Sequence, residues 1–599
     1  MADPEPAVRR SADVLRVGNC SGFYGDRLSA MREMLEGRST GPDGTPRTLD
    51  VLTGDYLAEL TMLILGRDAM RDPSLGYART VVRQLEDTLG LALEQGTRIV
   101  VNAGGLNPAG LADRVREVAR GLGLDPAVAH VEGADLREHA AELGHPGALT
   151  ANAYLGGFGI ARALDAGAEV VVTGRVTDAS LVLGAAASHF GWTPADHDAL
   201  AGAVVAGHVL ECGTQATGGN FSGFTRLPRR HLPLGFPLAE IEADGSCTVT
   251  KQDGTGGAVT LDTVTAQLVY EIQSTRYLGP DVTTELDTVR LEQVGEDRVR
   301  VSGTRGQAPP ATLKVCVNEL GGFRNSFELV LTGLDLDAKE AWVHEQLDHR
   351  LTAASVTWTR GITPRADAER QEDAACLLRC TGLDPEADPV GKAFTGPVVE
   401  LALASYPGFT LTGPPARPTP YGVYRPAYVD RAAVTHVVVL PDGTREVVPD
   451  PTDLAPTGPA PADLDDHGRR PSPYPAPADR LTRRQPLGTF VHARSGDKGG
   501  DANVGFWVAH DAPGDAEKRA DRVAWLFKVL SPKKVRELVP ESADLDVDVH
   551  LLPQLGAVNV VIHGLLGEGV AASTRTDPQA KALGEWLRSR MVQIQEGLL

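Results

Sequence analysis

The sequence predicts an α/β protein in which an N-terminal doubly wound, mainly parallel sheet is continued by an α+β segment. A small C-terminal α+β sandwich domain follows a Pro-rich linker. Over residues 13–230, short aliphatic runs alternate with glycine-rich polar loops and runs of helical period. Strand-like runs with turn signals dominate residues 231–448, and ten prolines fall in residues 449–486. Alternating strands and helices are typical of a parallel sheet covered on both faces, whereas dense proline favours an extended linker.

Four strand–loop–helix units make up the first part, with apolar runs that begin at residues 13, 48, 98 and 168. Residues 1–12 precede them and are predicted to be a flexible N-terminus. Open parallel sheets bind their ligands outside the carboxyl ends of the strands. The polar loops after the four runs therefore predict a ligand site at one edge of the sheet.

The later segments contain fewer helical signals. Helical runs at residues 337–354 and 367–381 interrupt the strands of the α+β segment, and VNELGGFRNSF is expected to form a hairpin with Gly321 and Gly322 at its tip. Residues 487–599 form the C-terminal domain, in which strands, helical runs and a final helix from residue 577 follow one another. That order favours a small α+β sandwich.

Composition excludes several classes of partner. The chain has 599 residues and a formal net charge of −21, with no cluster of Lys and Arg to attract nucleic acid or an anionic membrane. The N-terminus lacks a signal-peptide core, and no stretch reaches the roughly 20 apolar residues that span a bilayer. We expect a cytoplasmic protein. Large metabolic enzymes are often symmetric, which favours a homo-oligomer.

No resident cofactor or metal is expected. The six cysteines are too dispersed for a disulfide framework, and the close pair Cys376 and Cys380 has helical spacing without a second pair to complete a zinc site. A divalent ion between Asp497 and Asp501 would need more oxygen ligands than that loop offers. Glycine-rich dinucleotide and nucleotide motifs and the serine-hydrolase elbow are all missing from the sequence.

The strand-to-helix loops supply the first candidate site residues. Arg175 and Asp178 share one loop, giving a cation for a carboxylate or phosphate beside a candidate base. The alternative is that Asp178 only caps the next helix, and turn formation equally explains the asparagines and glycines. The further substrate-binding candidates in these loops are Asn19, Ser21, Gly22, Asp26, Asp55, Asn102, Gly104, Gly105 and Asn107.

Residues 207–223, GHVLECGTQATGGNFSG, look like a pocket wall. Glu211 is a candidate acid or base, and Cys212 is a candidate nucleophile if a cation lowers its pKa; otherwise it is a buried apolar residue. Thr214, Gln215 and Asn220 are expected to contact substrate. Further along, Arg324 and Asn325 are substrate contacts if the predicted hairpin folds back over the sheet edge.

The C-terminal domain contributes HARSGDKGGDANVGFW, predicted to be a strand, a glycine-rich loop and a second strand. A long linker would let this loop reach the pocket of another domain. We expect Arg494 and Lys498 to contact a substrate anion while Asp497 and Asp501 position the loop, with Asn503 as a further contact. The alternative is a charged turn that pairs with itself.

Several motifs together resemble the acyclic terpene utilisation protein AtuA family: NCSGFYGDR, NAGGLNP, VVTGRVTDASL, ECGTQATGGNF, YLGPDV and LGGFRNSF. HARSGDKGGDANVGFW and HGLLGEGVAASTRTDPQAKALGEWL are similar to the small domain that follows the AtuA core. The resemblance implies a role in degrading acyclic isoprenoid acids as CoA thioesters, but no defined reaction.

Three functions follow from these residues and this resemblance. The first is a lyase, of the hydratase or carbon–carbon lyase type, that acts on a branched acyl-CoA or a related carboxylate with Asp178 or Glu211 as base and Arg175 as anion contact. The second is a non-catalytic acyl-CoA-binding or assembly subunit of a carboxylase or lyase pathway. The third is a thioester hydrolase or acyltransferase that uses Cys212. CoA is expected only as part of the substrate.

Overall fold

The computed structural model describes residues 13–41, 45–455 and 481–599, which form two compact units. Met1–Asn318, Tyr424–Val570 and Gln579–Leu599 belong to the first unit, and Glu319–Val423 with Ala571–Pro578 make up the second. The predicted flexible N-terminus, residues 1–12, lies outside the described residues, as does most of the predicted linker (residues 456–480).

An 11-stranded sheet organises the first unit, and its parallel centre contains the predicted strand–loop–helix units. The order of the parallel strands is β1 (Val14–Asn19), β4 (Val51–Gly54), β5 (Arg98–Gly105), β8 (Val170–Gly174) and β6 (Val128–Glu132). Nearly every residue of these strands is buried. Continuous aliphatic runs give this pattern because both faces of a parallel sheet are covered.

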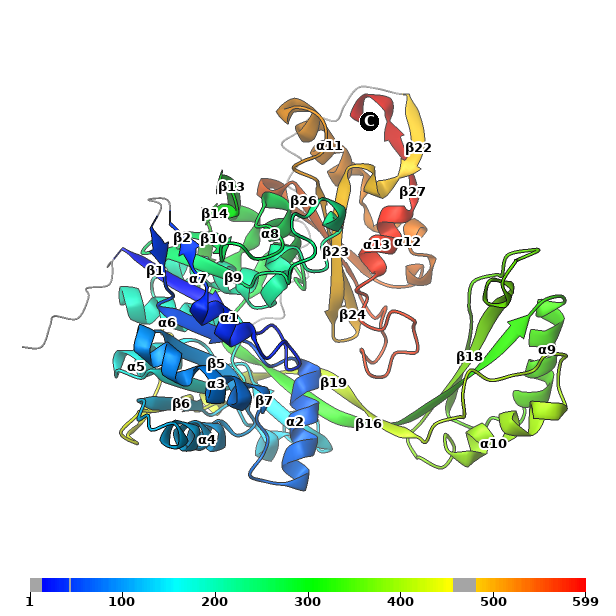
Figure 1. Cartoon of the computed structure of the whole chain (residues 1–599), viewed down its shortest axis with the longest axis horizontal. Helices are drawn as coiled ribbons and strands as arrows, with labels where there is room; N and C mark the ends of the chain where they lie inside the picture. Colours follow the sequence, from blue (N-terminus) through cyan, green and yellow to red (C-terminus); the bar gives the residue numbers. More distant parts are fainter. Residues whose placement is uncertain (1–12, 42–44, 456–480) are drawn as a thin grey trace, which may run out of the picture. The chain divides into compact units, whose positions relative to one another are not determined.

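Helices cover both faces of this sheet, which confirms the doubly wound prediction (Figure 1). One core lies beneath α1 (Ala30–Glu36), α3 (Thr80–Gln95) and α4 (Pro108–Gly121). The other lies beneath α5 (Phe158–Asp165), α6 (Ser180–Phe190) and α7 (His197–Leu210). Helices α6 and α7 are built largely of Ala, Gly, Val and Leu and are buried almost throughout, so they pack closely on the sheet and on each other.

Antiparallel strands extend the sheet at both edges. On the β1 side these are β9 (Pro237–Glu242), β10 (Cys247–Lys251), β14 (Arg298–Ser302) and β13 (Arg290–Gly295), and on the β6 side β20 (Val437–Val439) and β21 (Arg445–Val447). The chain therefore divides differently from the predicted 231–448 segment. Residues 231–318 and 424–448 belong to the first unit, whereas residues 319–423 belong to the second unit.

Further helices and strands complete the part of the first unit that precedes the C-terminal domain. They are β2 (Ser39–Thr40), β3 (Pro46–Arg47), α2 (Glu59–Arg71), β7 (Ala148–Ala153), α8 (Leu261–Leu268), β11 (Arg276–Leu278), β12 (Thr283–Glu285) and β15 (Arg305–Gln307). A 3-10 turn, η2 (Gly213–Thr217), follows α7 closely.

The second unit is a sheet packed on two helices, α9 (Leu336–Leu347) and α10 (Lys392–Glu400). Its strand order is β17 (Ser355–Arg360), β18 (Ala375–Asp384), β16 (Thr312–Thr332) and β19 (Thr419–Asp430). The chain of β16 and β19 continues into the first unit, where β7 pairs with β16.

Two predictions fail in this unit. The hairpin at Gly321 and Gly322 does not form, because β16 continues through both residues. A Cβ atom on Gly321 would lie 2.5 Å from the Tyr421 ring, so glycine permits close packing there rather than a turn. Residues 367–381 are also not a helix. Cys376 and Cys380 lie on strand β18 and alternate with exposed Leu377 and Arg379, the period of a half-buried strand.

The C-terminal domain has its own apolar core within the first unit. Its sheet order is β23 (Val491–Lys498), β24 (Asp501–Val508), β26 (Ala557–Ile562) and β25 (Val547–Leu552). The helices are α11 (Ala516–Val529), α12 (Pro532–Leu538) and α13 (Leu583–Ser589), and β22 (Thr482–Pro486) pairs with β27 (Met591–Gln595). The predicted glycine-rich loop is a tight β23–β24 hairpin with Gly499 in a left-handed conformation (φ 65°). None of the described helices is long and apolar enough to cross a membrane.

Candidate functional site

Charged and polar side chains from the ends of β4, β5, β7 and β8, from neighbouring segments and from the C-terminal hairpin gather within the first unit. Each of them bonds to, or electrostatically influences, others of the set. We call this set the strand-end cluster; it comprises Asp55, Glu59, Asn102, Tyr154, Arg175, Asp178, Glu211, Glu271, Lys314, Asp497 and Lys498.

Asp55 follows β4 and is almost fully buried. Its Oδ1 accepts hydrogen bonds from Asn102 Nδ2 at 2.5 Å and from the Leu57 backbone N–H at 3.1 Å. Asn102 lies on neighbouring β5, and its own Oδ1 accepts the Tyr56 backbone N–H. Two adjacent strand ends are thus joined by Asp55 and Asn102, which the sequence analysis had named as substrate-binding candidates.

Arg175 and Asp178 form an ion pair in the loop after β8, with Nη1 2.7 Å from Oδ1. Arg175 is 1% exposed, and its guanidinium lies over the ring of Tyr154 at 4.3 Å. The N-cap residue of α6 is Ala179, and no side chain caps this helix. The Asp178 carboxylate instead neutralises a buried cation. Substrate would meet Asp178 before Arg175, because the Asp178 side chain keeps 29% exposure and that of Arg175 only 2%.

Sequence reasoning missed two further charged residues beside Tyr154, which are Glu59 and Lys314. Glu59, at the start of α2, accepts a hydrogen bond from the Tyr154 hydroxyl at 2.9 Å. Lys314 Nζ lies 5.2 Å from the centroid of the same ring. Burial alone would raise the pKa of Glu59, but the charges of Lys498, Lys314 and Arg175 hold it at about 2. Both residues lie outside the polar loops, so no local signal marked them.

Glu211 is the C-cap residue of α7. It is buried, although a charged side chain at a helix end is usually solvated. Its Oε1 lies 2.9 Å from His208 Nδ1, while its Oε2 has no hydrogen-bond partner among the described residues. Asn19 at the end of β1 donates to the backbone oxygens of Leu210 and Glu211. Asn19 therefore positions Glu211 rather than facing substrate.

The C-terminal hairpin brings Lys498 into this region. Lys498 Nζ lies 3.1 Å from the Glu271 carboxylate, and its charge acts on Glu59, Asp178 and Glu211. Asn503 on β24 accepts the Glu271 N–H and donates to the Ile272 oxygen. Lys498 thus pairs with the core domain and not with Asp501, which faces it across the hairpin.

Arg494 lies four residues before Lys498 on β23 of the same hairpin. It is buried, its guanidinium lies 4.2 Å from the centroid of the Tyr270 ring, and it donates to Gln215 Oε1. These contacts fix the hairpin to η2 and to the segment before Glu271. Arg494 therefore orients the hairpin, and Lys498 is the cation nearer the carboxylates.

Several carboxyl groups in the cluster are held toward the neutral form. Burial, and then the charge of Asp178, raises the pKa of Asp55 well above its usual value. Burial likewise raises the pKa of Asp178 despite its ion pair with Arg175, and the pKa of Glu211 despite its contact with His208. Asp497, influenced by burial and by Glu271 and Glu59, has its pKa raised to about 7. Such shifts, combined with specific charge partners, are typical of acid–base sites.

The Cys212 thiol is not activated. Burial, and then the charges of Glu211 and Glu271, raises its pKa well above the usual value. A nucleophilic thiolate needs nearby positive charge, and the neighbours that dominate here are carboxylates. The structure thus gives the Cys212 hypothesis no support.

Other predicted site residues have structural partners instead. Asp26 accepts the Gly22 and Arg27 N–H groups, Ser21 bonds to the Phe23 oxygen, and Gly22 packs on the Cys212 backbone. Asn107 caps α4 by accepting the Gly110 N–H. The remaining positions are as follows: Gly104 packs closely on the Thr173 oxygen, Gly105 has φ 52°, half-buried Thr214 lies in η2, and exposed Asn220 has φ 55°.

Three predicted residues bond away from the cluster. Asp501 accepts from the Gly564 N–H and pairs with His563, 3.0 Å away. Arg324 and Asn325 belong to the second unit, where they donate to the backbone oxygens of Ala571, and of Val390 and Ala416. The contacts of Arg324 and Asn325 are structural contacts within the second unit.

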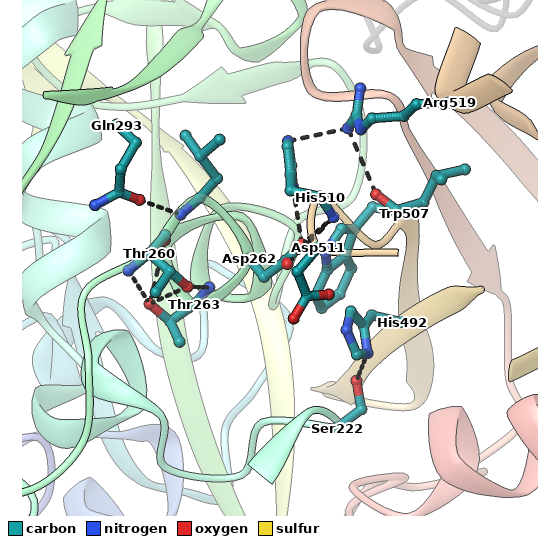
Figure 2. Close-up of polar contacts among 12 residues, drawn as sticks. Ser222, Thr260, Asp262, Thr263, Gln293, His492, Trp507, His510, Asp511 and Arg519 are labelled. Carbon is teal, nitrogen blue, oxygen red and sulfur yellow. Dashed lines mark hydrogen bonds and ion pairs between the residues drawn. The ribbon is translucent and has the colours of Figure 1, made fainter. Parts of the chain in front are cut away.

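A different polar network joins the core to the C-terminal domain (Figure 2). Asp262, at the start of α8, accepts from the Trp507 indole N–H at 2.9 Å and from His510 Nδ1 at 2.8 Å. His492 Nδ1 bonds to Ser222 Oγ at 2.8 Å. We call Asp262, His492, Trp507 and His510, with Ser222, the domain lock.

Asp262, His492 and Asp511 are the group of described residues whose ligand atoms lie close enough to hold a metal ion, within 4.8 Å of one another. All three have protein partners already: Asp511 pairs with Arg226, whose Nη2 also lies 3.2 Å from His492 Nε2. A guanidinium between two prospective ligands competes with a cation. We therefore treat the group as part of the domain lock, and the expectation of no metal remains a prediction.

The fold and these contacts define a class: a doubly wound α/β protein whose candidate site is completed by a hairpin from a small C-terminal domain. Residues 15–440 match the family described as acyclic terpene utilisation family protein AtuA, and residues 485–593 match the AtuA ferredoxin-like domain. The chain therefore belongs to the acyclic terpene utilisation AtuA family, as its motifs had indicated. No curated protein gives a significant match.

Proposed function

We propose that this protein is a lyase of the hydratase type that acts on a branched acyl-CoA or a related carboxylate. The family places it in acyclic terpene utilisation. The observation that carries the proposal is the set of buried carboxyl groups with raised pKa values, gathered around cations from both domains. Water addition or removal beside a carbonyl needs one base, one acid and a cation, and this cluster supplies all three kinds of group.

Glu211 is the proposed base. One of its oxygens is held by His208, and the other has no partner among the described residues. Its pKa is raised by burial, which makes its carboxylate a stronger base than one in water. In the elimination direction Glu211 takes the proton from the carbon next to the substrate carbonyl, and the C–H electron pair becomes the new C=C bond.

Asp497 is the proposed acid. With a pKa raised to about 7, it is partly protonated at neutral pH. As the C=C bond forms, the C–O bond one carbon further along breaks, and the departing oxygen takes the Asp497 proton and leaves as water. Hydration is the reverse. Lys498, whose Nζ is 3.1 Å from Glu271, stabilises the negative charge that develops on the carbonyl oxygen.

Arg175 and Asp178 position the substrate. Their ion pair at 2.7 Å presents the half-exposed carboxylate toward ligand while the guanidinium stays buried over Tyr154. The buried Arg175 acts on the substrate through Asp178, whose carboxylate it holds in place. The proposal includes a cytoplasmic homo-oligomer without a resident cofactor.

The test is to incubate the full-length protein with a panel of branched saturated, unsaturated and 3-hydroxy acyl-CoAs and to follow masses. We expect interconversion of one unsaturated and hydroxylated pair by gain or loss of water. Glu211→Gln should lower kcat by about 10²–10⁴-fold, the usual contribution of a positioned base. The control is Glu94→Gln on the exposed face of α3. No mass change with any member, or unchanged kcat in Glu211→Gln, contradicts the proposal.

A second candidate is an acyl-CoA-binding or assembly subunit without catalysis. It is favoured by the internal pairing of the cluster, since Arg175 is paired with Asp178 and Lys498 with Glu271. Side chains that already form ion pairs can hold a ligand in place without taking part in a reaction. In the same experiment this candidate predicts saturable binding of an acyl-CoA with no change in mass, and equal affinity in wild type and Glu211→Gln.

A further inference from the structure

Tyr277 begins the YLGPDV motif and lies on β11, opposite Thr284 of β12. Its ring packs against the core beneath α5, α6 and α7. The ring centroid is 5.3 Å from that of His208, and His208 Nδ1 is 2.9 Å from Glu211 Oε1. Tyr277 therefore lies beside the residue that we propose as the base.

The Tyr277 hydroxyl has no hydrogen-bond partner among the described residues. The side chain is half-buried, and the hydroxyl is not among the polar atoms that lack both a partner and contact with solvent. A tyrosine in the interior usually finds a partner for its hydroxyl. The Tyr277 hydroxyl is thus free to bond to a molecule that enters the site from solvent.

Charges of the strand-end cluster act on this hydroxyl. The influence of Glu211 is the largest among them, and those of Lys498, Asp178 and Glu271 follow. The effect on Lys498 is reciprocal, since Tyr277 is among the groups that act on its ammonium. Electrostatic interaction weakens with distance, so the oxygen end of the ring is directed toward the cluster. The hydroxyl therefore lies near both the proposed base and the cation of the C-terminal hairpin.

The Tyr277 hydroxyl is a neutral donor. Burial, and then the charge of Glu211, raises the pKa of Tyr277 well above its usual value. The phenol therefore keeps its proton at neutral pH, which excludes it as a base and leaves it available as a hydrogen-bond donor. Preorganised donors stabilise the charge that develops on a substrate oxygen in the transition state.

The segment that leads to Tyr277 also carries the partner of Lys498. Glu271 has a left-handed backbone (φ 57°), which is uncommon for a residue other than glycine, and its N–H donates to Asn503 Oδ1. Strained backbone of this kind persists where surrounding contacts fix it, and it is concentrated at functional sites. One short segment, fixed by the C-terminal domain, therefore positions both Glu271 and Tyr277.

We infer that Tyr277 is a further catalytic residue, whose hydroxyl donates a hydrogen bond to the carbonyl oxygen of the substrate beside Lys498. This inference rests on the proposed hydratase reaction and adds a second donor to it. When Glu211 takes the proton from the neighbouring carbon, negative charge moves onto the carbonyl oxygen, and the phenol and the ammonium share its stabilisation. The charge returns to the carbon chain as the C–O bond breaks, so no proton leaves Tyr277.

The first experiment compares turnover by wild type and by Tyr277→Phe on the acyl-CoA pair that the wild type interconverts. We expect kcat to fall about 10²–10³-fold, the usual effect of losing one preorganised donor, and KM to change less than about threefold. Tyr428→Phe is the control, because Tyr428 is an exposed tyrosine of the same unit. Equal kcat in wild type and Tyr277→Phe overturns this inference and leaves the proposed reaction standing. No conversion by the wild type contradicts the proposed reaction and this inference with it.

Infrared spectroscopy tests the contact without turnover. The probe is isobutyryl-CoA with carbon-13 at its thioester carbonyl, which has neither a hydroxyl group nor a C=C bond to react. A hydrogen bond to the oxygen weakens the C=O bond and lowers its stretching frequency. We expect the frequency of the bound probe to be higher in Tyr277→Phe than in wild type and unchanged in Tyr428→Phe. The same frequency in wild type and Tyr277→Phe overturns the inference, as does a wild type that does not bind the probe.

Discussion

The strand-end cluster and the domain lock contain the same kinds of residue, but the pKa of Asp262 in the lock and those of Asp55 and Asp497 in the cluster shift in opposite directions. In the domain lock, Asp262 accepts bonds from Trp507 and His510, and although burial alone would raise its pKa, His510 holds it at about 2. In the strand-end cluster, burial and neighbouring carboxylates raise the pKa values of Asp55 and Asp497. Satisfied charges fix a structure, whereas incompletely satisfied carboxyls remain available to exchange protons.

The largest expected effect is a loss of turnover, which we expect from a variant of the strand-end cluster and not from one of the domain lock. Asp497→Asn should lower kcat by about 10²–10⁴-fold, because it removes the proposed acid. The free energy of unfolding should stay the same or rise, since a buried carboxyl with a raised pKa is costly when charged. Turnover on whichever acyl-CoA the wild type converts, together with urea denaturation, tests both parts.

Asparagine is close in size and shape to a protonated aspartic acid, so Asp497→Asn is a mild change in packing. A fall in stability above about 2 kcal/mol with intact turnover would make the strand-end cluster a structural feature like the domain lock.

The second prediction concerns the domain lock. Asp262→Ala should lower the free energy of unfolding by about 3 kcal/mol, because it leaves the buried Trp507 N–H and the His510 ring without their acceptor. Denaturation followed by tryptophan fluorescence, to which Trp507 contributes together with the other five tryptophans, is the measurement. A loss below about 1 kcal/mol would show that the lock does not stabilise the contact between the domains.

The third prediction is a pH dependence that originates in the lock. Burial is the main cause that lowers the pKa of His492 to about 4; Asp262 opposes this, while Arg588, Arg226 and His510 add to it. The unfolded chain therefore binds the His492 proton at higher pH than the folded one. Stability from this group is complete above about pH 6.5 and is lost progressively toward pH 4, by up to about 3 kcal/mol.

The measurement is the free energy of unfolding between pH 8 and pH 4 in wild type and in His492→Asn, whose amide still reaches Ser222. The variant should show a smaller fall over this window. Some fall should remain, because burial lowers the pKa of His436 to about 4 as well. Identical curves would exclude His492 as a source of the dependence.

The smallest expected effect concerns how the hairpin is oriented. Arg494→Lys keeps the charge but loses the planar contact with Tyr270 and the bond to Gln215. We expect KM for the converted acyl-CoA to rise about three- to tenfold with little change in kcat. A large fall in kcat at constant KM would instead place Arg494 at the reacting atoms.

The sequence predicted the parallel sheet well because buried strands that alternate with amphipathic helices leave a strong local pattern. Asp55, Asn102, Arg175 and Asp178 were marked for the same reason, since parallel strands end at one edge. The failures lie where local pattern is ambiguous. Residues 375–384 support a helical period and a strand period equally, and only pairing with β16 and β17 selects the strand.

Glu59, Glu271 and Lys314 show what local pattern cannot reveal. Glu59 begins a helix, Lys314 lies within a long strand, and Glu271 follows a helix, so each looks like an ordinary solvated charge in sequence. Their partners are Tyr154 and Lys498, far away in the chain.

The sequence by itself determined the fold class, the family and the edge of the sheet where polar loops meet, because these depend on periodicity and on motifs within a few dozen residues. Only the tertiary structure decided which charges pair. In the folded protein Lys498 pairs with Glu271 and Asp501 pairs with His563, although Lys498 and Asp501 face each other across one hairpin. Pairing and burial depend on distances between remote segments, and burial sets the pKa values on which the proposed chemistry depends.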